Sequence, residues 1–316
     1  MQRASDIRSA ALLICTFKRP QTFARLMQSV AALAIPAGLA FEIVIADNNP
    51  ESAWETYVAP AVAGLPWSVH YGHEPQAGYS SARNKAIEVA LAETTAEVFL
   101  FTDDDMILDS GWLVGHLRSL AALEADVVNG RIHGVRERNS HGTVLEKCGA
   151  GNVSFRRRLV DASGLGLRFD PAFNKLGMED QAFFREACRR GAAIRQSDWP
   201  RLYNYYGEGP VPEEEVLNKM LTTAAMQHNE VALARRDRGL VPAAMLASKG
   251  LVFGLKGLGL MAESRLWAAM GRAEKARKSA LSSEKELLKM RGRFAGFGGE
   301  IVSRQDVRRS DPAGKG

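Results

Sequence analysis

The chain has 316 residues, of which 46% are hydrophobic and 24% charged, a composition that suits one large α/β domain with an extension and excludes a largely disordered chain. Its three cysteines, Cys15, Cys148 and Cys188, are far apart and odd in number. We therefore expect neither a disulfide framework nor a zinc knuckle, and a reducing compartment such as the cytoplasm.

The net charge of +5 is unevenly distributed along the chain. Residues 1–240 carry 26 basic and 29 acidic side chains, whereas residues 241–316 carry 15 basic and 7 acidic ones. The acidic first part argues against nucleic acid as a partner, and the basic last part suits an anionic surface such as a phospholipid leaflet. The sequence holds no run of 18 uncharged apolar residues, so we expect a soluble or peripheral protein without a spanning helix.

Apolar runs rich in β-branched or aromatic residues alternate with helical patterns in the first hundred residues. Strands are predicted at 11–17, 42–47, 67–72 and 97–103. A helix is predicted at 20–33, beginning at Pro20, and a second at 80–94, with Ser80 or Ser81 as its N-cap. This order predicts a Rossmann-like, mostly parallel sheet flanked by helices, whose ligand site lies at the carboxyl ends of the strands.

The rest of the chain is less regular at first and then helical. Residues 126–135 and 149–158 indicate further strands, and an amphipathic helix after residue 178 ends at Gly191. From Pro212 to about residue 290 the pattern is helical, and the last residues are expected to be disordered. We therefore predict an α/β domain at 1–210 and a basic helical extension at 211–316.

Polar residues follow the predicted strands, and the acidic triplet Asp103, Asp104 and Asp105 is the strongest of these features. Three adjacent carboxylates repel one another, and a divalent cation that also binds phosphate is the usual counter-charge. In an extended segment Asp103 and Asp105 would point to the same side. A solvated acidic turn or a helix N-cap cluster is the alternative reading of this triplet.

Six motifs stand in a characteristic order: ALLICTFKRP, EIVIADNN, GYSSARNKAI, FLFTDDDMILDSGWL, GNVSFRR and GMEDQAFF. Together, over about residues 10–200, they resemble the family 2 glycosyltransferases, whose fold is called GT-A. The resemblance implies an inverting enzyme that moves a sugar from a nucleotide-diphosphate donor, with UDP the expected nucleotide, to a hydroxyl acceptor.

The resemblance also implies roles for individual residues. The residues expected to bind the nucleotide sugar are Thr16, Phe17, Arg19, Asp47, Arg83, Asp103 and Asp104. Asp105 is the expected ligand of a divalent metal, Mn²⁺ or Mg²⁺. Two departures are visible: Asp47-Asn48-Asn49 replaces the family's frequent Asp-Asp-Gly-Ser, and the stretch after residue 197 lacks the histidine that often completes the metal shell. Asn204 or a tyrosine is the expected substitute, and the alternative is that Asp105, the diphosphate and water hold the metal alone.

Glu179-Asp180 corresponds to the catalytic-base motif of this family. Asp180 is expected to take the proton from the acceptor hydroxyl, while Glu179 contacts the acceptor or the sugar. First-turn acids that only favour the helix dipole are the alternative. The expected acceptor is a glycan or a lipid-linked intermediate of polysaccharide assembly, and the basic helices are expected to meet an anionic membrane surface from the cytoplasm. A non-catalytic sugar-nucleotide or glycan-binding module, or a nucleotidyltransferase, are the competing functions.

Overall fold

The computed structural model describes residues 7–133, 139–174, 177–204 and 213–296. These residues form two compact units. Residues 7–174 and 179–204 make the sheet unit, and residues 177–178 and 213–296 make the helical unit. The domain boundary predicted at residue 210 lies outside the described residues. The C-terminal tail that was predicted to be disordered also lies outside them, since the last described residue is 296.

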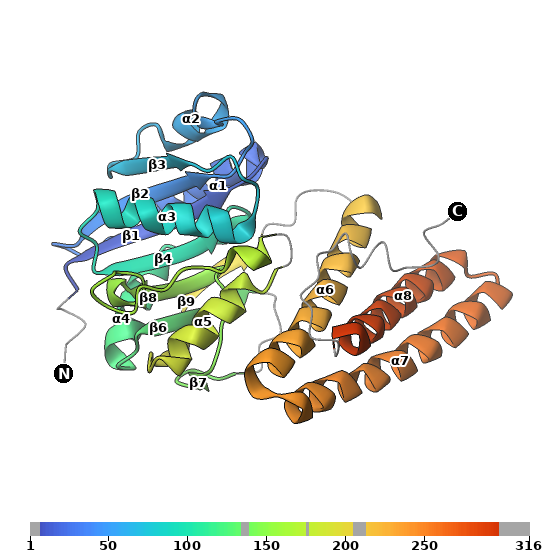
Figure 1. Cartoon of the computed structure of the whole chain (residues 1–316). Helices are drawn as coiled ribbons and strands as arrows, with labels where there is room; N and C mark the ends of the chain where they lie inside the picture. The colour runs from blue at the N-terminus through green and yellow to red at the C-terminus, as the bar shows by residue number, and fades with distance from the viewer. Residues whose placement is uncertain (1–6, 134–138, 175–176, 205–212, 297–316) are drawn as a thin grey trace. The chain divides into compact units, whose positions relative to one another are not determined.

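The sheet unit contains the elements of an α/β fold (Figure 1). Its strands are β1 (Ser9–Thr16), β2 (Ala40–Asp47), β3 (Val69–His73), β4 (Val98–Asp103), β5 (Met106–Leu108), β6 (Val127–His133), β7 (Val144–Leu145), β8 (Asn152–Arg156) and β9 (Ile194–Asn204). Its α-helices are α1 (Pro20–Ala31), α2 (Ala59–Val62), α3 (Tyr79–Glu93), α4 (Trp112–Ala122) and α5 (Glu179–Arg189). Short π and 3₁₀ turns occupy Trp54–Val58, Arg157–Leu159 and Pro171–Phe173.

The strands form one mixed sheet in the order β3-β2-β1-β4-β8-β6-β9-β5, with β7 paired to β9. The first four strands are parallel, as predicted. Strand β8 runs antiparallel to both β4 and β6, and β5 runs antiparallel to β9. The sheet is thus parallel where strands and helices alternate along the chain, and mixed where the sequence pattern is less regular.

Helices cover both faces of the sheet because each carries one apolar stripe. On α1 the stripe is Phe23, Leu26, Met27 and Val30, at helical spacing, and it packs in one core with residues of α4. On the other face, buried residues of α3 and α5 share a second core with alternate residues of β1 and β4. This two-layer burial holds the strand ends of the parallel half in a fixed arrangement.

Helix α3 does not use the serine cap that the sequence predicts. It begins at Tyr79 after Gly78, and Ser80 lies inside the helix and donates to the backbone oxygen of Asp170. The first-turn amide of Ser81 is instead bound by Asn174 Oδ1 at 2.8 Å. The N-cap prediction was wrong because the capping oxygen comes from a residue 93 positions along the chain, which local sequence does not reveal.

The helical unit consists of α6 (Glu213–Arg238), α7 (Leu240–Ala269) and α8 (Ala273–Ala295). The prediction of helix from Pro212 to about residue 290 is therefore confirmed for the described part. Within the described residues, one segment, Ala243–Ala269, is long and apolar enough to cross a membrane, although its interior burial is low. The sequence prediction that no helix could span a membrane considered only runs without charged residues. The segment Ala243–Ala269 contains 18 consecutive residues that are apolar on average and include no more than two charged side chains.

Candidate active site

The carboxyl ends of three neighbouring parallel strands lie at one edge of the sheet. Thr16 at the end of β1 lies opposite Asp47 at the end of β2, and Cys15 lies opposite Asp103 at the end of β4. The prediction that the polar residues past these strands gather at one edge is therefore confirmed. In open α/β sheets this edge is where ligands bind.

The acidic triplet is not one extended segment. Strand β4 ends at Asp103, and Asp104 and Asp105 form a turn before β5. The expectation that strand alternation places Asp103 and Asp105 on one side was wrong, because the alternation stops at the turn. The two carboxylates still interact: burial raises the pKa of Asp105, and the nearby charge of Asp103 raises it further.

Asp104 joins the end of β1 to the turn after β4. Its Oδ2 accepts hydrogen bonds from the Thr16 hydroxyl at 3.0 Å and from the Phe17 amide at 3.3 Å, and its Oδ1 accepts one from Arg19 at 3.0 Å. The side chain is buried, and this burial raises its pKa to about 6 although Arg19 opposes the shift. Asp104 thus fixes the geometry of this edge, and its carboxylate is engaged by its own chain.

Arg19 and Phe17 are the more accessible members of the strand-end group. Arg19 is about half exposed and also contacts Asp105 Oδ2 at 2.8 Å, so one guanidinium holds two carboxylates. The Phe17 ring is 42% exposed, and the Lys18 ammonium lies 5.3 Å from its centroid. An exposed aromatic ring beside cationic groups is suited to stacking on a base.

Asp47 is fully buried and bound by its own loop. Its Oδ1 accepts from the amide and side chain of Asn49, and its Oδ2 accepts from the Ala53 amide and the Tyr71 hydroxyl, both at 2.6 Å. Four donors occupy this carboxylate, so Asp47 orders the loop after β2 in this structure. Tyr71 is a functional neighbour that the sequence did not reveal, since its partner is 24 residues away.

Arg83 connects two acidic clusters, residues 103–105 and 179–180, that lie far apart in the sequence. Its buried guanidinium, on α3, forms an ion pair with Glu179 at the start of α5 and a second, at 3.4 Å, with Asp103. The Asp103 side chain is 43% exposed. The strand-end acids and the Glu179-Asp180 pair therefore belong to one site, joined by a single buried arginine.

Glu179 and Asp180 differ in their surroundings. Glu179 is buried and its contact is with Arg83, whereas Asp180 is half-buried and its Oδ2 accepts from the Ala150 amide at 3.2 Å. Burial raises the pKa of both carboxyl groups, Arg83 opposes this, and the charge of Asp103 raises that of Asp180 further. A raised pKa makes Asp180 a better proton acceptor than an exposed aspartate.

The segment Gly149-Ala150-Gly151 passes between these carboxylates. A Cβ on Gly151 would lie 2.7 Å from Asp103 Oδ2, and one on Gly149 would lie 3.4 Å from Asp180 Oδ2. The glycines thus allow the backbone to approach both acids. Sequence reasoning missed this role, although the paired glycines before strand β8 were the visible sign of a close approach.

The donor groups at this edge fit a divalent cation. Five acidic side chains, Asp103, Asp104, Asp105, Glu179 and Asp180, accompany two arginines, and carboxylate oxygen is the ligand that Mg²⁺ and Mn²⁺ prefer. Among the described residues no cluster of three or more His, Cys, Asp or Glu can hold a metal by itself. Asn204, the proposed substitute ligand, lies opposite Met106 in the β5–β9 pairing, one residue beyond Asp105.

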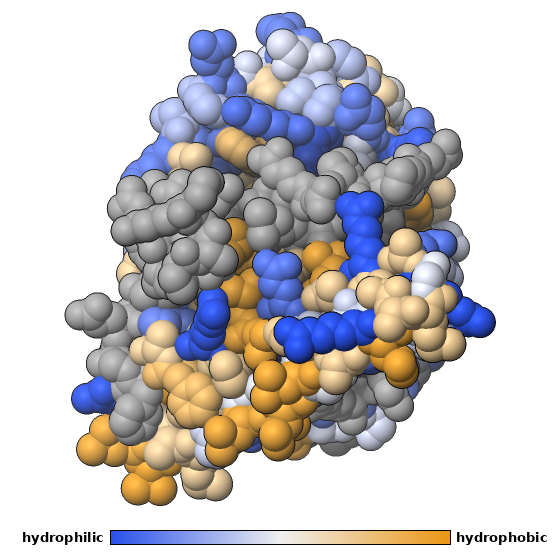
Figure 2. Space-filling view, turned by 90° about the vertical axis from the view of Figure 1, so that its right-hand side faces the viewer, coloured by the Kyte–Doolittle hydropathy of each residue, from blue (hydrophilic) through white to orange (hydrophobic). Residues whose placement is uncertain are grey.

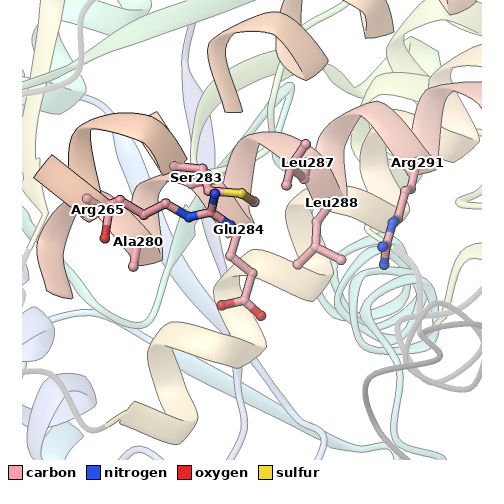
Figure 3. Close-up of a pocket in the computed structure, with 9 residues that line it drawn as sticks. Arg265, Ala280, Ser283, Glu284, Leu287, Leu288 and Arg291 are labelled. Carbon is pink, nitrogen blue, oxygen red and sulfur yellow. The ribbon is translucent and has the colours of Figure 1, made fainter. Parts of the chain in front are cut away.

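A separate cavity of about 360 Å³ belongs to the helical unit (Figure 3). It lies between α7 and α8 and combines the apolar side chains of Leu287 and Leu288 with Arg265, Glu284 and Arg291. Its volume would admit a small molecule. The cavity shares no residue with the strand-end site, so its chemistry is independent of the acids described above.

Comparison with known proteins agrees with this geometry. The family model described as "Glycosyl transferase family 2" matches residues 11–179. The succinoglycan biosynthesis protein ExoM of Rhizobium meliloti (strain 1021) is 26% identical over 257 residues, which cover 75% of this chain and 79% of that protein.

Two solved structures share the fold. The mannosyltransferase PcManGT from Pyrobaculum calidifontis, in complex with GDP-Man and Mn²⁺, aligns with a TM-score of 0.62 at 14% identity over 93% of this chain and 89% of its own. TarS of S. aureus, residues 1–349 in complex with UDP-GlcNAc, aligns with a TM-score of 0.53 at 16% identity over 88% and 89% of the two chains.

The mixed sheet, its flanking helices and the acids beyond its strand ends define a GT-A nucleotide-sugar transferase. The chain belongs to glycosyltransferase family 2, because the family model covers more than half of it, from the first strand to Glu179. Transfer of a sugar from a nucleotide-sugar donor is the activity of this family. The resemblance first read from the six motifs is thereby confirmed.

Proposed function

We propose that this enzyme inverts the anomeric centre while moving a sugar from a UDP donor to a hydroxyl, with Asp180 as the base. The supporting observation is that Arg83 joins Glu179 to Asp103, which brings Asp180 into the same site as the strand-end acids. In a single displacement, the acceptor oxygen attacks the anomeric carbon and the carbon–oxygen bond to the diphosphate breaks. The carboxylate of Asp180 takes the hydroxyl proton, and the bond's electron pair leaves with the diphosphate.

The remaining site residues are assigned by their accessibility. Phe17 stacks on the base, Arg19 faces the diphosphate side, and Asp103 contacts the donor. Arg83 is buried, and it acts on the diphosphate side through its ion pair with Asp103. Thr16, Asp47 and Asp104 are buried and engaged by their own chain, so we assign them to positioning the strand ends. Glu179, buried against Arg83, orients that arginine. This replaces the direct donor and acceptor contacts expected for these four residues from sequence.

We propose that Asp105, with Asp103, holds a Mn²⁺ or Mg²⁺ ion together with the donor. The site already carries more carboxylates than arginines, so a diphosphate would meet net repulsion there without a further cation. When bound, the metal supplies charge neutralisation of the leaving diphosphate. Its remaining ligands would be phosphate oxygens and water, since no group of three or more His, Cys, Asp or Glu side chains among the described residues is arranged to hold a metal ion.

We propose an acceptor hydroxyl on a growing glycan or a lipid-linked intermediate, used at the cytoplasmic face of a membrane. The name of the curated relative places that protein in succinoglycan biosynthesis. The basic C-terminal part, with 15 basic and 7 acidic residues after position 240, matches an anionic membrane surface.

The substitution Asp180→Asn tests the base. We expect UDP release from a UDP-sugar with Mn²⁺ to fall on the order of a hundredfold or more, the contribution typical of general-base catalysis. The thermal stabilisation of the protein by UDP should stay unchanged and exceed that by GDP. An unchanged rate of UDP release in Asp180→Asn would show that Asp180 is not the catalytic base. A wild-type protein that binds UDP but does not release it from a UDP-sugar would support a non-catalytic binding module.

A further inference from the structure

Helix α7 turns its smallest residues toward the other helices of its unit. Its buried positions are Ala243, Ala247, Gly250, Gly254 and Gly257, which recur at intervals of three and four. On α8, Met290 Sδ lies 2.5 Å from where a Cβ of Gly254 would be, and Leu287 lies 2.9 Å from where one of Gly257 would be. The backbone of α7 therefore lies close against α8.

The opposite face of α7 carries the large apolar side chains. We call this set the outward face: Val241, Met245, Leu251, Val252, Leu255, Leu258 and Leu266, each more than half exposed. Figure 2 shows one face of the molecule on which apolar residues gather, with long hydrophilic side chains beside them. A surface helix of a water-soluble domain has the reverse arrangement, with its large apolar residues buried.

Small residues between helices and large apolar residues facing outward are typical of helices that contact lipid. In lipid, close backbone approach drives helix packing, and outward leucines meet a medium as apolar as themselves. Basic residues flank the outward face: Lys249 lies on one edge and Arg265 on the other, while Lys256 pairs with Glu286 of α8 at 3.0 Å. Such residues reach phosphate groups while their aliphatic stems remain in the apolar layer.

We propose that α7 lies in the plane of an anionic bilayer with its outward face embedded in the interface. Crossing the bilayer is disfavoured because α8, packed along α7, carries seven basic and three acidic residues. Each charge at the bilayer centre costs about 2.5–3.5 kcal/mol on insertion scales. In the plane, α8 stays on the aqueous side, where Glu286 is held between Lys256 and Lys289 at 3.0 and 3.1 Å.

This inference rests on the membrane partner of the proposed function and not on its sugar chemistry. Flotation of the full-length protein with vesicles of phosphatidylcholine and phosphatidylglycerol tests it. We expect the wild type to float with these vesicles. The triple variant Leu251→Gln, Leu255→Gln, Leu258→Gln should lose partitioning on the order of a hundredfold, because three apolar side chains no longer enter the interface. Glutamine preserves helix propensity, and circular dichroism checks it.

The chain offers a matched control on the sheet unit. Leu255 is 72% exposed and Val144 on β7 is 68% exposed, so Leu255→Gln should weaken flotation whereas Val144→Gln should not. Equal flotation of the triple variant and the wild type would overturn the proposal, as would a wild type that stays in solution. A dimer in light scattering that the triple variant abolishes would assign the face to a second copy instead.

Catalysis is measured in parallel so that the two proposals fail separately. With a soluble acceptor, the triple variant should release UDP at the wild-type rate, since the outward face lies in the helical unit and the proposed base lies in the sheet unit. Asp180→Asn should float like the wild type while its UDP release falls. A wild-type protein that floats with the vesicles but releases no UDP would support the membrane docking of α7 and refute the proposed enzyme mechanism.

Discussion

Replacing the buried Asp104 with asparagine should remove part of the pH dependence of stability. The folded protein raises the pKa of this carboxyl from 3.8 to about 6, chiefly through burial. Between those two values the folded chain keeps a proton that the unfolded chain has released. The free energy of unfolding of the wild type therefore falls as pH rises from about 4 to about 6, and then levels off.

The size of this fall follows from the shift. A difference of about two pKa units corresponds to about 3 kcal/mol at 1.36 kcal/mol per unit. Asparagine in the same place has no proton to lose, so the variant should lack this contribution. It will also be less stable at every pH, because its amide group faces Arg19, where Asp104 Oδ1 accepted a hydrogen bond.

Urea unfolding followed by tryptophan fluorescence at pH 4.5, 5.5 and 7.5 measures the effect. The stability difference between wild type and Asp104→Asn should be larger at pH 4.5 than at pH 7.5. Asp161→Asn is a control that should show almost no pH dependence in this range, since hydrogen bonds from Ser163 and Arg157 lower the pKa of Asp161 to about 2 and both folded and unfolded chains are ionised there above pH 4.5. Parallel stability curves for wild type and Asp104→Asn would refute the assignment of a raised pKa to this buried carboxyl.

Two further substitutions test the contacts that hold the two acidic clusters, residues 103–105 and 179–180, together. Gly151→Ala should lower kcat/KM on the order of tenfold to a hundredfold, because its Cβ would lie 2.7 Å from Asp103 Oδ2 and displace that carboxylate. Gly259→Ala, where a Cβ meets nothing within 4 Å, should leave the rate unchanged. Glu179→Gln leaves Arg83 buried without its main counter-charge and should lower the free energy of unfolding in urea by about 2 kcal/mol. Glu88→Gln, at an exposed pair, should cost less than about 0.5 kcal/mol; equal losses would contradict the role of burial.

The first half of the fold could be read from the sequence because its information is local. Apolar runs at 11–17, 42–47 and 97–103 alternate with helical spacing, and a parallel sheet then brings the strand ends to one edge. The site edge was predictable for the same reason. The cap of α3 by Asn174 and the hydrogen bond from Tyr71 to Asp47 were not, since these partners are 93 and 24 residues apart.

The faces of α7 were also beyond sequence reasoning. Leucines and glycines alternate along 250–260 in a pattern that suits packing in either direction, and only the position of α8 shows that Gly250, Gly254 and Gly257 face inward. The sequence predicted a helix here, but not one long and apolar enough to cross a membrane, because Lys249 and Lys256 interrupt its uncharged runs. In the structure these lysines lie to one side of the outward face, where they leave its apolar character intact.

The acidic residues at the strand ends fall into two groups, which differ in whether hydrogen-bond donors of the chain itself occupy their carboxylate oxygens. Asp47 and Asp104 are buried, and donors from their own chain occupy their oxygens, so they set the geometry of the loops. Asp103, Asp105 and Asp180 are more accessible. Burial raises the pKa values of Asp105 and Asp180, and the charge of Asp103 raises both further. The repulsion between these carboxylates is relieved by a cation beside Asp103 and Asp105 or by a proton on Asp180. The same arrangement therefore suits a metal-bound diphosphate on one side of Arg83 and a proton-accepting carboxylate on the other.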